Sequence, residues 1–202
     1  MSAAEPLWTR EDIDTVHGAL EDRSDDIMRG YATPETAARD RLFFTMGINS
    51  GLRPGDLIKI PADEELLAKD SVTIKMQKTR KPVTFNIGES LRKALDEYWE
   101  AHVGETPKYL FYRSYRATPY YHRHVSSKWA YRFWQRFTER AGIEGHYSSH
   151  SSRKTLANMV YMTTGDVVDA QMLLGHKDPG TTLGYIGVIG KRAREAQAGL
   201  NL

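Results

Sequence analysis

The sequence predicts a mainly α-helical protein with one small antiparallel β-sheet, the α+β class. Apolar residues recur at helical spacing over most of the chain, a pattern typical of amphipathic helices. Between residues 72 and 87 this pattern gives way to two short runs of β-branched and aromatic residues around a polar turn. The chain has 202 residues, of which 40% are hydrophobic, enough for one substantial core. We therefore expect a single domain over residues 1–202, with its core over about residues 7–186.

Helix start signals identify two helices in the first quarter of the chain. Thr9 is followed three residues later by Asp12, the spacing of a capping box, and this predicts a helix that runs to about Ala19. Thr33-Pro34 begins a second helix, because proline is favoured in the first helical turn. This helix is expected to end near Ser50-Gly51, since glycine commonly follows the last helical residue.

The middle of the chain predicts the sheet. Residues 72–76 and 82–87 have strand character and flank the polar turn Lys78-Thr79-Arg80-Lys81, so we expect a hairpin with a basic tip. Residues 187–202 are expected to form a C-terminal tail or short helix. Helical periodicity predicts four further helices, over residues 91–99, 125–141, 153–161 and 167–174.

Positive charge is concentrated in one part of the chain, although the formal net charge is only +2. Between residues 108 and 158 there are ten lysines and arginines but only two acids, and tyrosines and tryptophans lie among the cations. This composition is typical of a surface that contacts nucleic-acid phosphates, while a solvated helix face has the same appearance. The residues predicted to contact DNA are Lys128, Arg132, Arg136 and Lys154.

Four short motifs follow one another along the chain. They are Gly51-Leu52-Arg53-Pro54-Gly55-Asp56-Leu57, Gln77-Lys78-Thr79, His150-Ser151-Ser152-Arg153, and Leu174-Gly175-His176 with Tyr185 nine positions after the histidine. In residue type and spacing they resemble the motifs of the tyrosine recombinases, the superfamily of phage integrases, Xer recombinases and fimbrial invertases. The resemblance covers residues 7–186, nearly the whole chain.

Two departures from the family pattern are visible. Ser151-Ser152 and Lys154 stand around the second arginine, where the family more often has an acid-leucine pair and a histidine. We expect no separate N-terminal core-binding domain of the kind found in most integrases, and in this the chain resembles the compact fimbrial invertases.

The resemblance implies a tyrosine recombinase catalytic-domain fold and a reaction that cleaves and rejoins DNA through a 3′-phosphotyrosine. Tyr185 is the implied nucleophile, and Arg53 and Arg153 would stabilise negative charge on the phosphate. His176 would add a hydrogen-bond donor. Neither a cofactor nor a metal ion is implied, because the phosphotyrosine keeps the bond energy that rejoining requires.

The remaining implied roles concern proton transfer and support. Lys78 would be the general acid for the leaving oxygen, although Lys75 and Lys81 leave open which lysine of the hairpin has this role. His150 would act as a base or an orienting group for the nucleophile, and Asp56 would support the first arginine.

The implied partner is double-stranded DNA. Family members act as a homotetramer on two DNA sites and exchange strands in pairs through a Holliday junction. We therefore expect the same assembly here, with protomers that are monomeric without DNA. The tail, residues 187–202, is expected to dock on a neighbouring protomer. No apolar run approaches the roughly 18 residues of a membrane span, and no secretion signal is present. A cytoplasmic, DNA-associated protein with no membrane partner is therefore expected.

Two other classes of function fit parts of the sequence. A catalytically silent, sequence-specific DNA-binding protein derived from a recombinase could place residues 125–141 in a major groove. A metallohydrolase could use His122-x-His124 and His146-x-x-x-His150, but few acids lie nearby to complete such a site, and the absence of cysteine excludes thiolate ligands. Tyr185, one of eleven tyrosines, could by itself be a packing residue. A covalent protein–DNA species would distinguish the recombinase from both alternatives.

Overall fold

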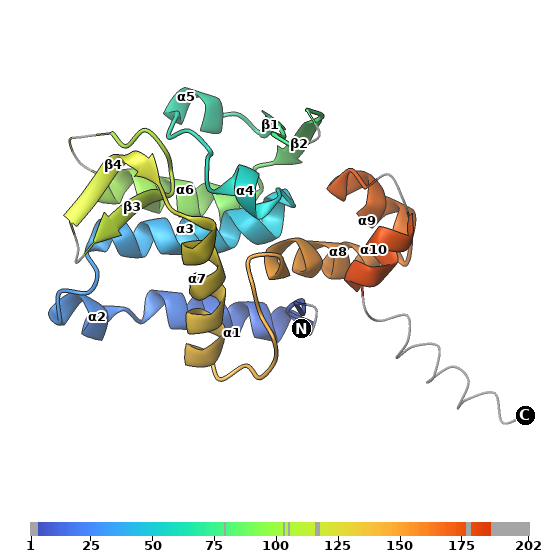
Figure 1. Ribbon diagram of the computed structural model, residues 1–202, viewed down its shortest axis with the longest axis horizontal. Helices are drawn as coiled ribbons and strands as arrows, with labels where there is room; N and C mark the ends of the chain where they lie inside the picture. The colour runs from blue at the N-terminus through green and yellow to red at the C-terminus, as the bar shows by residue number, and fades with distance from the viewer. Residues whose placement is uncertain are drawn as a thin grey trace, which may run out of the picture.

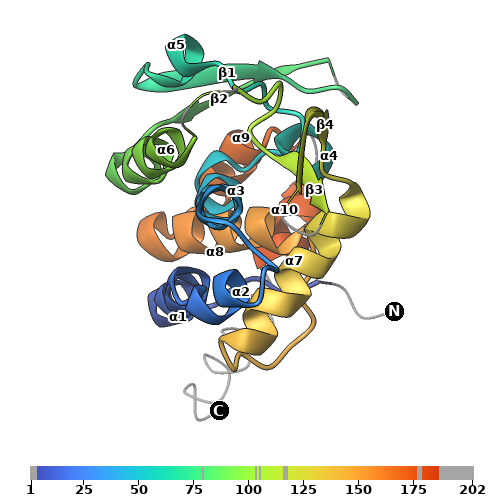
Figure 2. The ribbon, with the colours of Figure 1, turned by 90° about the vertical axis from the view of Figure 1, so that its left-hand side faces the viewer.

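The computed structural model describes residues 4–78, 80–102, 104, 106–115, 118–176 and 179–186. Within these residues ten helices and two two-stranded antiparallel sheets are present (Figures 1 and 2). The elements are α1 (Arg10–Glu21), α2 (Ser24–Met28), α3 (Pro34–Ser50), α4 (Pro54–Leu57), α5 (Glu64–Leu67), β1 (Ser71–Lys75), β2 (Pro82–Asn86), α6 (Glu89–Ala101), β3 (Tyr112–Tyr115), β4 (Thr118–His124), α7 (Ser127–Arg140), α8 (Ser151–Thr164), α9 (Val167–Leu174) and α10 (Pro179–Ile186).

The predicted α+β class is confirmed, with one small sheet more than expected. None of the helices in the described ranges combines the length and the apolar character that crossing a lipid bilayer would require. Residues 187–202, for which a tail was predicted, lie outside the described residues.

Helix α3 occupies the centre of the fold. It packs against α1, α6 and α8, and Figure 2 shows it lying between these helices. Phe43 on this helix is 1% exposed, and its ring meets those of Phe111, Trp129 and Phe133 edge-on at 4.9–5.1 Å between centroids. Such edge-to-face pairs are a favoured aromatic geometry, and these three attach α7 and the segment before β3 to α3.

Local signals set the ends of the first long helices where the sequence predicts them. The Thr9 and Thr33 side chains each cap a helix by accepting a backbone hydrogen bond, in complete capping boxes. Helix α3 ends at Ser50, and Gly51 adopts a left-handed conformation with φ of 61°. A Cβ atom at Gly51 would lie only 2.9 Å from a side-chain carbon of Leu156. Glycine is therefore favoured at this turn, which leads the chain directly into Arg53.

The predicted hairpin is formed by β1 and β2. Val72 lies opposite Phe85 and Ile74 opposite Val83, so that apolar side chains share the face of the sheet that is turned toward α3. Lys78 and Lys81 lie in the turn between the strands, and Lys75 is the last residue of β1.

A second hairpin, β3 with β4, is not predicted by the sequence. Its register shifts between Tyr112 and Arg113, and its residues are aromatic and basic rather than alternately apolar and polar, so the pattern typical of a strand is lost. Helix α2 was missed for a related reason. None of its five residues is buried, so it lacks an apolar periodicity.

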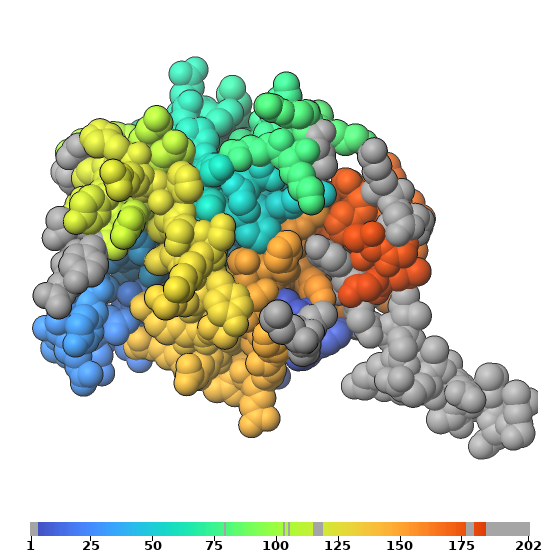
Figure 3. Space-filling view, in the orientation of Figure 1, coloured from blue at the N-terminus to red at the C-terminus, as the bar shows by residue number. Residues whose placement is uncertain are grey.

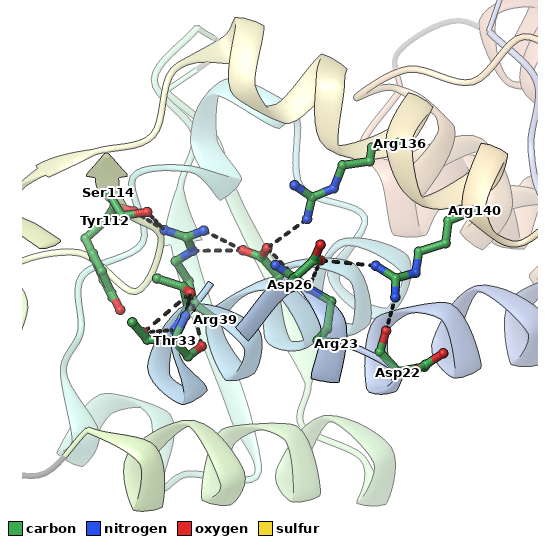
Figure 4. Close-up of polar contacts among 11 residues, drawn as sticks. Asp22, Arg23, Asp26, Thr33, Arg39, Tyr112, Ser114, Arg136 and Arg140 are labelled. Atoms are coloured by element: carbon green, nitrogen blue, oxygen red, sulfur yellow. Dashed lines mark hydrogen bonds and ion pairs between the residues drawn. The ribbon is translucent and has the colours of Figure 1, made fainter. Parts of the chain in front are cut away.

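A buried ionic network joins α2, α3, α7 and β3 (Figure 4). Asp40 is 4% exposed and pairs with Arg23 at 2.9 Å and with Arg39 at 2.6 Å. Arg39 also donates to the carbonyl oxygen of Tyr112 at 2.9 Å. Arg136 of α7 reaches the same carboxylate at 3.9 Å. These contacts connect the helical layers at the end of the molecule away from α9 and α10 (Figure 1).

Candidate active site

Three of the predicted catalytic side chains line one cleft. Arg53, Lys78 and His150 border a cleft of about 850 Å³. Figure 3 shows this face, where the α4 segment lies between the β1–β2 hairpin, α7 and the start of α8. Its other lining residues include Asp56, Lys59, Gln77, His124, Ser126, Ser127 and Ser149. The cleft thus joins three of the four sequence motifs.

Arg53 enters the cleft from the position immediately before α4. The turn at Gly51 and the helix-starting Pro54 fix its backbone. Its side chain is half-buried, and Nη1 donates to the sulfur of Met76 at 2.7 Å. The carboxylate of Asp56, the predicted support of Arg53, instead accepts a hydrogen bond from the backbone N–H of Gln77 at 2.8 Å. No hydrogen bond or ion pair joins the side chains of Asp56 and Arg53 within the part of the chain that the structure describes.

Arg153 lies in the first turn of α8 and is 1% exposed. Its Nη1 donates to the carbonyl oxygen of Gly51. Its Nη2 donates to the carbonyl oxygen of Leu174 at 3.1 Å and to Nε2 of His176 at 3.0 Å. The guanidinium therefore connects the end of α3, the end of α9 and the residue after Gly175, and its charge is held in one place by backbone acceptors.

His176 follows the left-handed Gly175 that ends α9. Because Nε2 accepts from Arg153, the ring proton belongs on Nδ1, which donates to the Thr182 hydroxyl oxygen at 3.0 Å. Partial burial, reinforced by the charges of Arg153 and then Arg53, lowers the pKa of His176 to about 4. The imidazole is therefore neutral near pH 7.

His150 is the residue that precedes α8 and is exposed in the cleft. Desolvation lowers the pKa of His150, and the charges of Arg153, Lys154 and Arg53 act in the same direction. Both guanidinium groups thus act electrostatically on both histidines. The structure brings together the two arginines and two histidines that the sequence predicts for one site.

The three lysines of the hairpin lie in different places. Lys78 lines the cleft with Arg53 and His150. Lys81 lines a separate groove of about 250 Å³ between the hairpin and α9, beside His176. Lys75 is exposed at the end of β1 and is among the lining residues of neither. This arrangement favours Lys78 as the lysine of the site.

Tyr185 lies in α10, and its side chain is outside the described residues. Helix α10 packs against α8 and α9, the helices that carry Arg153 and lead into His176. Thr182, three residues before Tyr185, is completely buried and is the partner of His176. The backbone of the predicted nucleophile therefore belongs to the helix that is attached to the site.

The four side chains predicted to contact DNA differ in their exposure and in their other contacts. Lys128, Arg132 and Arg136 are exposed along α7, which begins beside the cleft at Ser126 and Ser127. Arg136 is also near Asp40 in the buried network and lies over the Phe137 ring at 4.5 Å. Lys154, in the first turn of α8, is half-buried, and burial lowers its pKa.

The four histidines of the metallohydrolase alternative do not converge. His124 lines the cleft with His150, while His122 is exposed and His146 lies beyond α7 near Tyr147. In the described ranges no group of three or more histidine, aspartate or glutamate side chains is arranged to hold a metal ion.

Several residues that contact the site or line it have no role predicted from the sequence. Among them are Lys59, Met76, Gln77, His124 and Thr182. Lys59 stands six residues after Arg53 and Gln77 stands next to Lys78, but only the folded chain shows that the two touch each other. His124 is expected from the sequence only as a metal ligand of the alternative function, and its Nδ1 lies 2.6 Å from the Val125 carbonyl oxygen.

Comparisons with known proteins identify the family. The sequence pattern described as the phage integrase family matches residues 20–190. The probable integrase/recombinase YoeC of Bacillus subtilis (strain 168) is 31% identical over 150 residues, which cover 74% of this chain and 78% of that protein. Tyrosine recombinase XerC of Caldanaerobacter subterraneus subsp. tengcongensis is 30% identical over 162 residues, covering 78% of this chain but only 44% of that protein.

The fold is also similar to that of a solved structure. The crystal structure of XerA recombinase superposes with a TM-score of 0.71 at 20% identity and covers 100% of this chain and 67% of that one. This chain thus spans a part of the length of the Xer recombinases that it matches. It belongs to the phage integrase family and has the catalytic-domain fold of the tyrosine recombinases.

Proposed function

We propose that this protein is a site-specific DNA recombinase that cleaves and rejoins DNA with Tyr185 as its nucleophile. The observation that carries the proposal is the convergence of Arg53, Arg153, His150 and His176 beside the cleft that Lys78 lines. Family membership supports the same class of reaction.

The two arginines suit the charge of a phosphoryl transition state. When an oxygen attacks phosphorus, negative charge grows on the non-bridging oxygens, and fixed donors there lower the barrier. Guanidinium groups stay charged and donate two parallel hydrogen bonds to phosphate. Arg153 is already fixed by the carbonyl oxygens of Gly51 and Leu174, so its charge requires little reorganisation during the reaction.

The proposed chemical step is a transfer between two oxygens. The Tyr185 hydroxyl loses its proton and attacks phosphorus, the bond from phosphorus to the 5′ oxygen breaks, and a 3′-phosphotyrosine forms. Lys78 donates the proton that the leaving 5′ oxygen requires. His150 accepts or orients the Tyr185 proton, and its lowered pKa supports this role because a base must be unprotonated. A 5′ hydroxyl from another strand reverses the step.

His176 requires a change of hydrogen bonding to act as a donor. In this structure Nε2 accepts from Arg153 and Nδ1 donates to Thr182. Burial lowers the pKa of His176 first and the charge of Arg153 adds to it, so a phosphate bound to Arg153 would offset the second of these effects and favour the protonated ring. We therefore propose that phosphate binding protonates Nε2, which then donates to a non-bridging oxygen.

The assembly is proposed from related structures. Lambda integrase has been solved as a tetramer bound to a Holliday junction, and XerH bound to its difH substrate. We propose that this chain likewise binds double-stranded DNA and forms a homotetramer on two sites, with the tail docked on a neighbour. Deleting residues 191–202 should then abolish cooperative assembly on DNA, measured by gel shift, and unchanged cooperativity would exclude the docking role.

Covalent capture tests the proposal. The protein is incubated with DNA that flanks its own gene, the mixture is denatured, and the DNA that stays attached is sequenced, with Tyr185→Phe in parallel. The expected result is attachment at discrete paired sites that the variant loses. DNA binding without attachment would instead support a catalytically silent DNA-binding protein.

A further inference from the structure

The two residues before Lys78 are both attached to the segment that carries Arg53. Met76 is 1% exposed, and its sulfur accepts the hydrogen bond from Arg53. Gln77 donates from its backbone N–H to the Asp56 carboxylate at 2.8 Å, and its side-chain oxygen accepts from Nζ of Lys59 at 2.7 Å. Two adjacent residues of the hairpin thus have three contacts with residues 53–59.

These contacts are made by the residues that directly follow strand β1. β1 ends at Lys75, and the turn is closed by hydrogen bonds from Met76 N–H to the Lys81 carbonyl oxygen and from Arg80 N–H to the Met76 carbonyl oxygen, both at 2.9 Å. Those bonds fix the shape of the turn. Its position relative to Arg53 depends on contacts across the cleft, which Asp56 and Lys59 provide.

We infer that Lys59 is a positioning residue, which by holding Gln77 places the Lys78 ammonium group at the leaving oxygen. The inference rests on the proposed function. A general acid must be within hydrogen-bond reach of the atom that it protonates, and a displacement of about 1 Å can slow a reaction about a hundredfold. The Lys59–Gln77 contact is exposed, so it adjusts the position of a turn that Met76 and Asp56 also hold.

The alternative role for Lys59 is a direct contact with a DNA phosphate. The two roles differ in what they change. A phosphate contact contributes a slope of about 0.9 to the dependence of log affinity on log salt concentration, whereas a positioning residue leaves that slope unchanged. A positioning residue that acts through a general acid affects only reactions whose leaving group needs a proton.

The experiment compares two substrates in single-turnover cleavage. Both are nicked duplexes that carry the site recovered by covalent capture, one with the natural phosphodiester and one with sulfur in place of the bridging 5′ oxygen. A thiolate leaves without a proton, since thiols have pKa values of about 8.5. The variants are Lys59→Met, Gln77→Met and the double variant. Lys78→Ala reports full loss of the acid, and Lys93→Met, an exposed lysine of α6 paired with Glu97, is the matched control.

We expect Lys59→Met and Gln77→Met each to slow cleavage of the natural substrate about tenfold, a part of the roughly 10²–10⁴-fold that a general acid contributes. The double variant should be no slower than the single variants, because the two substitutions remove the same Lys59–Gln77 contact. On the sulfur substrate, these three variants and Lys78→Ala should each have a cleavage rate within about twofold of that of the unaltered protein. The salt slope and the melting temperature should be unchanged, and Lys93→Met should behave as the unaltered protein.

Three results would overturn the inference while leaving the proposed function intact. They are an unchanged rate on the natural substrate, a loss that persists on the sulfur substrate, and a salt slope reduced by about 0.9 in Lys59→Met. If the unaltered protein forms no covalent species on any substrate, the proposed function itself fails, and the inference fails with it.

Discussion

At the scale of single residues, His176 shows how burial and neighbouring arginines together keep an imidazole neutral. Arg153 donates to Nε2, and burial together with that charge lowers the pKa of the imidazole from 6.5 to about 4. As the pH falls below about 6.5, the unfolded chain takes up a proton that the folded protein does not accept until about pH 4. This histidine therefore contributes stability above pH 6.5 that is lost between these values.

We predict that the ring signals of His176 in the DNA-free protein do not titrate between pH 8 and about pH 5. An NMR titration, with the signal assigned from the spectrum of His176→Gln, measures this directly. A midpoint near the ordinary value of 6.5 would show that the imidazole is not held in its partly buried position beside Arg153 in solution.

The sequence predicts the residues of the site better than the side chains that hydrogen-bond to them. Arg53, His150, Arg153 and His176 are grouped as expected from residue type and spacing. The buried hydroxyl of Thr182 was not assigned a role, because its contact depends on how α10 packs on α8 and α9. Long-range packing of this kind leaves no local pattern in the sequence.

At the scale of elements, the β1–β2 turn contains a backbone conformation that does not suit its residue. Arg80 has φ of 57°, in the left-handed region, which costs a residue with a Cβ atom roughly 1–2 kcal/mol. Glycine removes that cost but loses about 0.4–1 kcal/mol through greater freedom in the unfolded chain. We expect Arg80→Gly to raise the free energy of unfolding by roughly 0.5–1 kcal/mol.

Urea denaturation of Arg80→Gly and Arg80→Ala tests this expectation. Alanine keeps the Cβ atom but removes the guanidinium, so it separates the backbone effect from the loss of charge. Equal stability of the two variants would mean that the turn is not strained in solution.

Local start and stop signals predicted α1 and α3, whereas α4 and α5 were missed although Pro54 and the capping Asp63 begin them, because four residues are too few for an apolar periodicity. Helices α1 and α3 begin at capping threonines, and α3 ends at the left-handed Gly51. The β3–β4 hairpin has a shifted register and a mixture of aromatic and basic residues, a composition that indicates a charged surface and gives no strand signal. Its pairing is decided by burial against α3 through residues such as Phe111 and Arg39.

At the scale of the whole molecule, the buried network around Asp40 holds together helices that are distant in sequence (Figure 4). Asp40→Asn would leave Arg23 and Arg39, each 3% exposed, facing an uncharged amide. Removing one partner of a buried ion pair typically costs about 3–5 kcal/mol, and we expect a loss of this size in urea denaturation. Asp14→Asn is the control, because the Asp14–Arg10 pair is at the surface and should change stability by less than about 1 kcal/mol. Similar small losses in both variants would show that the network does not stabilise the fold.

The proposed DNA contacts of α7 belong to the same scale, since they would orient the whole molecule on a duplex. Alanine at Arg132 or Arg136 should weaken binding to any duplex and reduce the salt slope by about 0.9 for each phosphate that the side chain neutralises. Binding isotherms at several salt concentrations give this slope. An unchanged slope for Arg136→Ala, whose side chain also reaches Asp40 at 3.9 Å, would place that arginine in the ionic network rather than on DNA.

The central claim is that Tyr185 becomes covalently attached to DNA. The most direct test is to trap the protein on DNA, trim the DNA with a nuclease, digest the protein and locate the remaining nucleotide by mass spectrometry. The account predicts a 3′-linked nucleotide on Tyr185 and on none of the other ten of the eleven tyrosines. A nucleotide on a different residue, or DNA binding with no linked peptide at all, would contradict it.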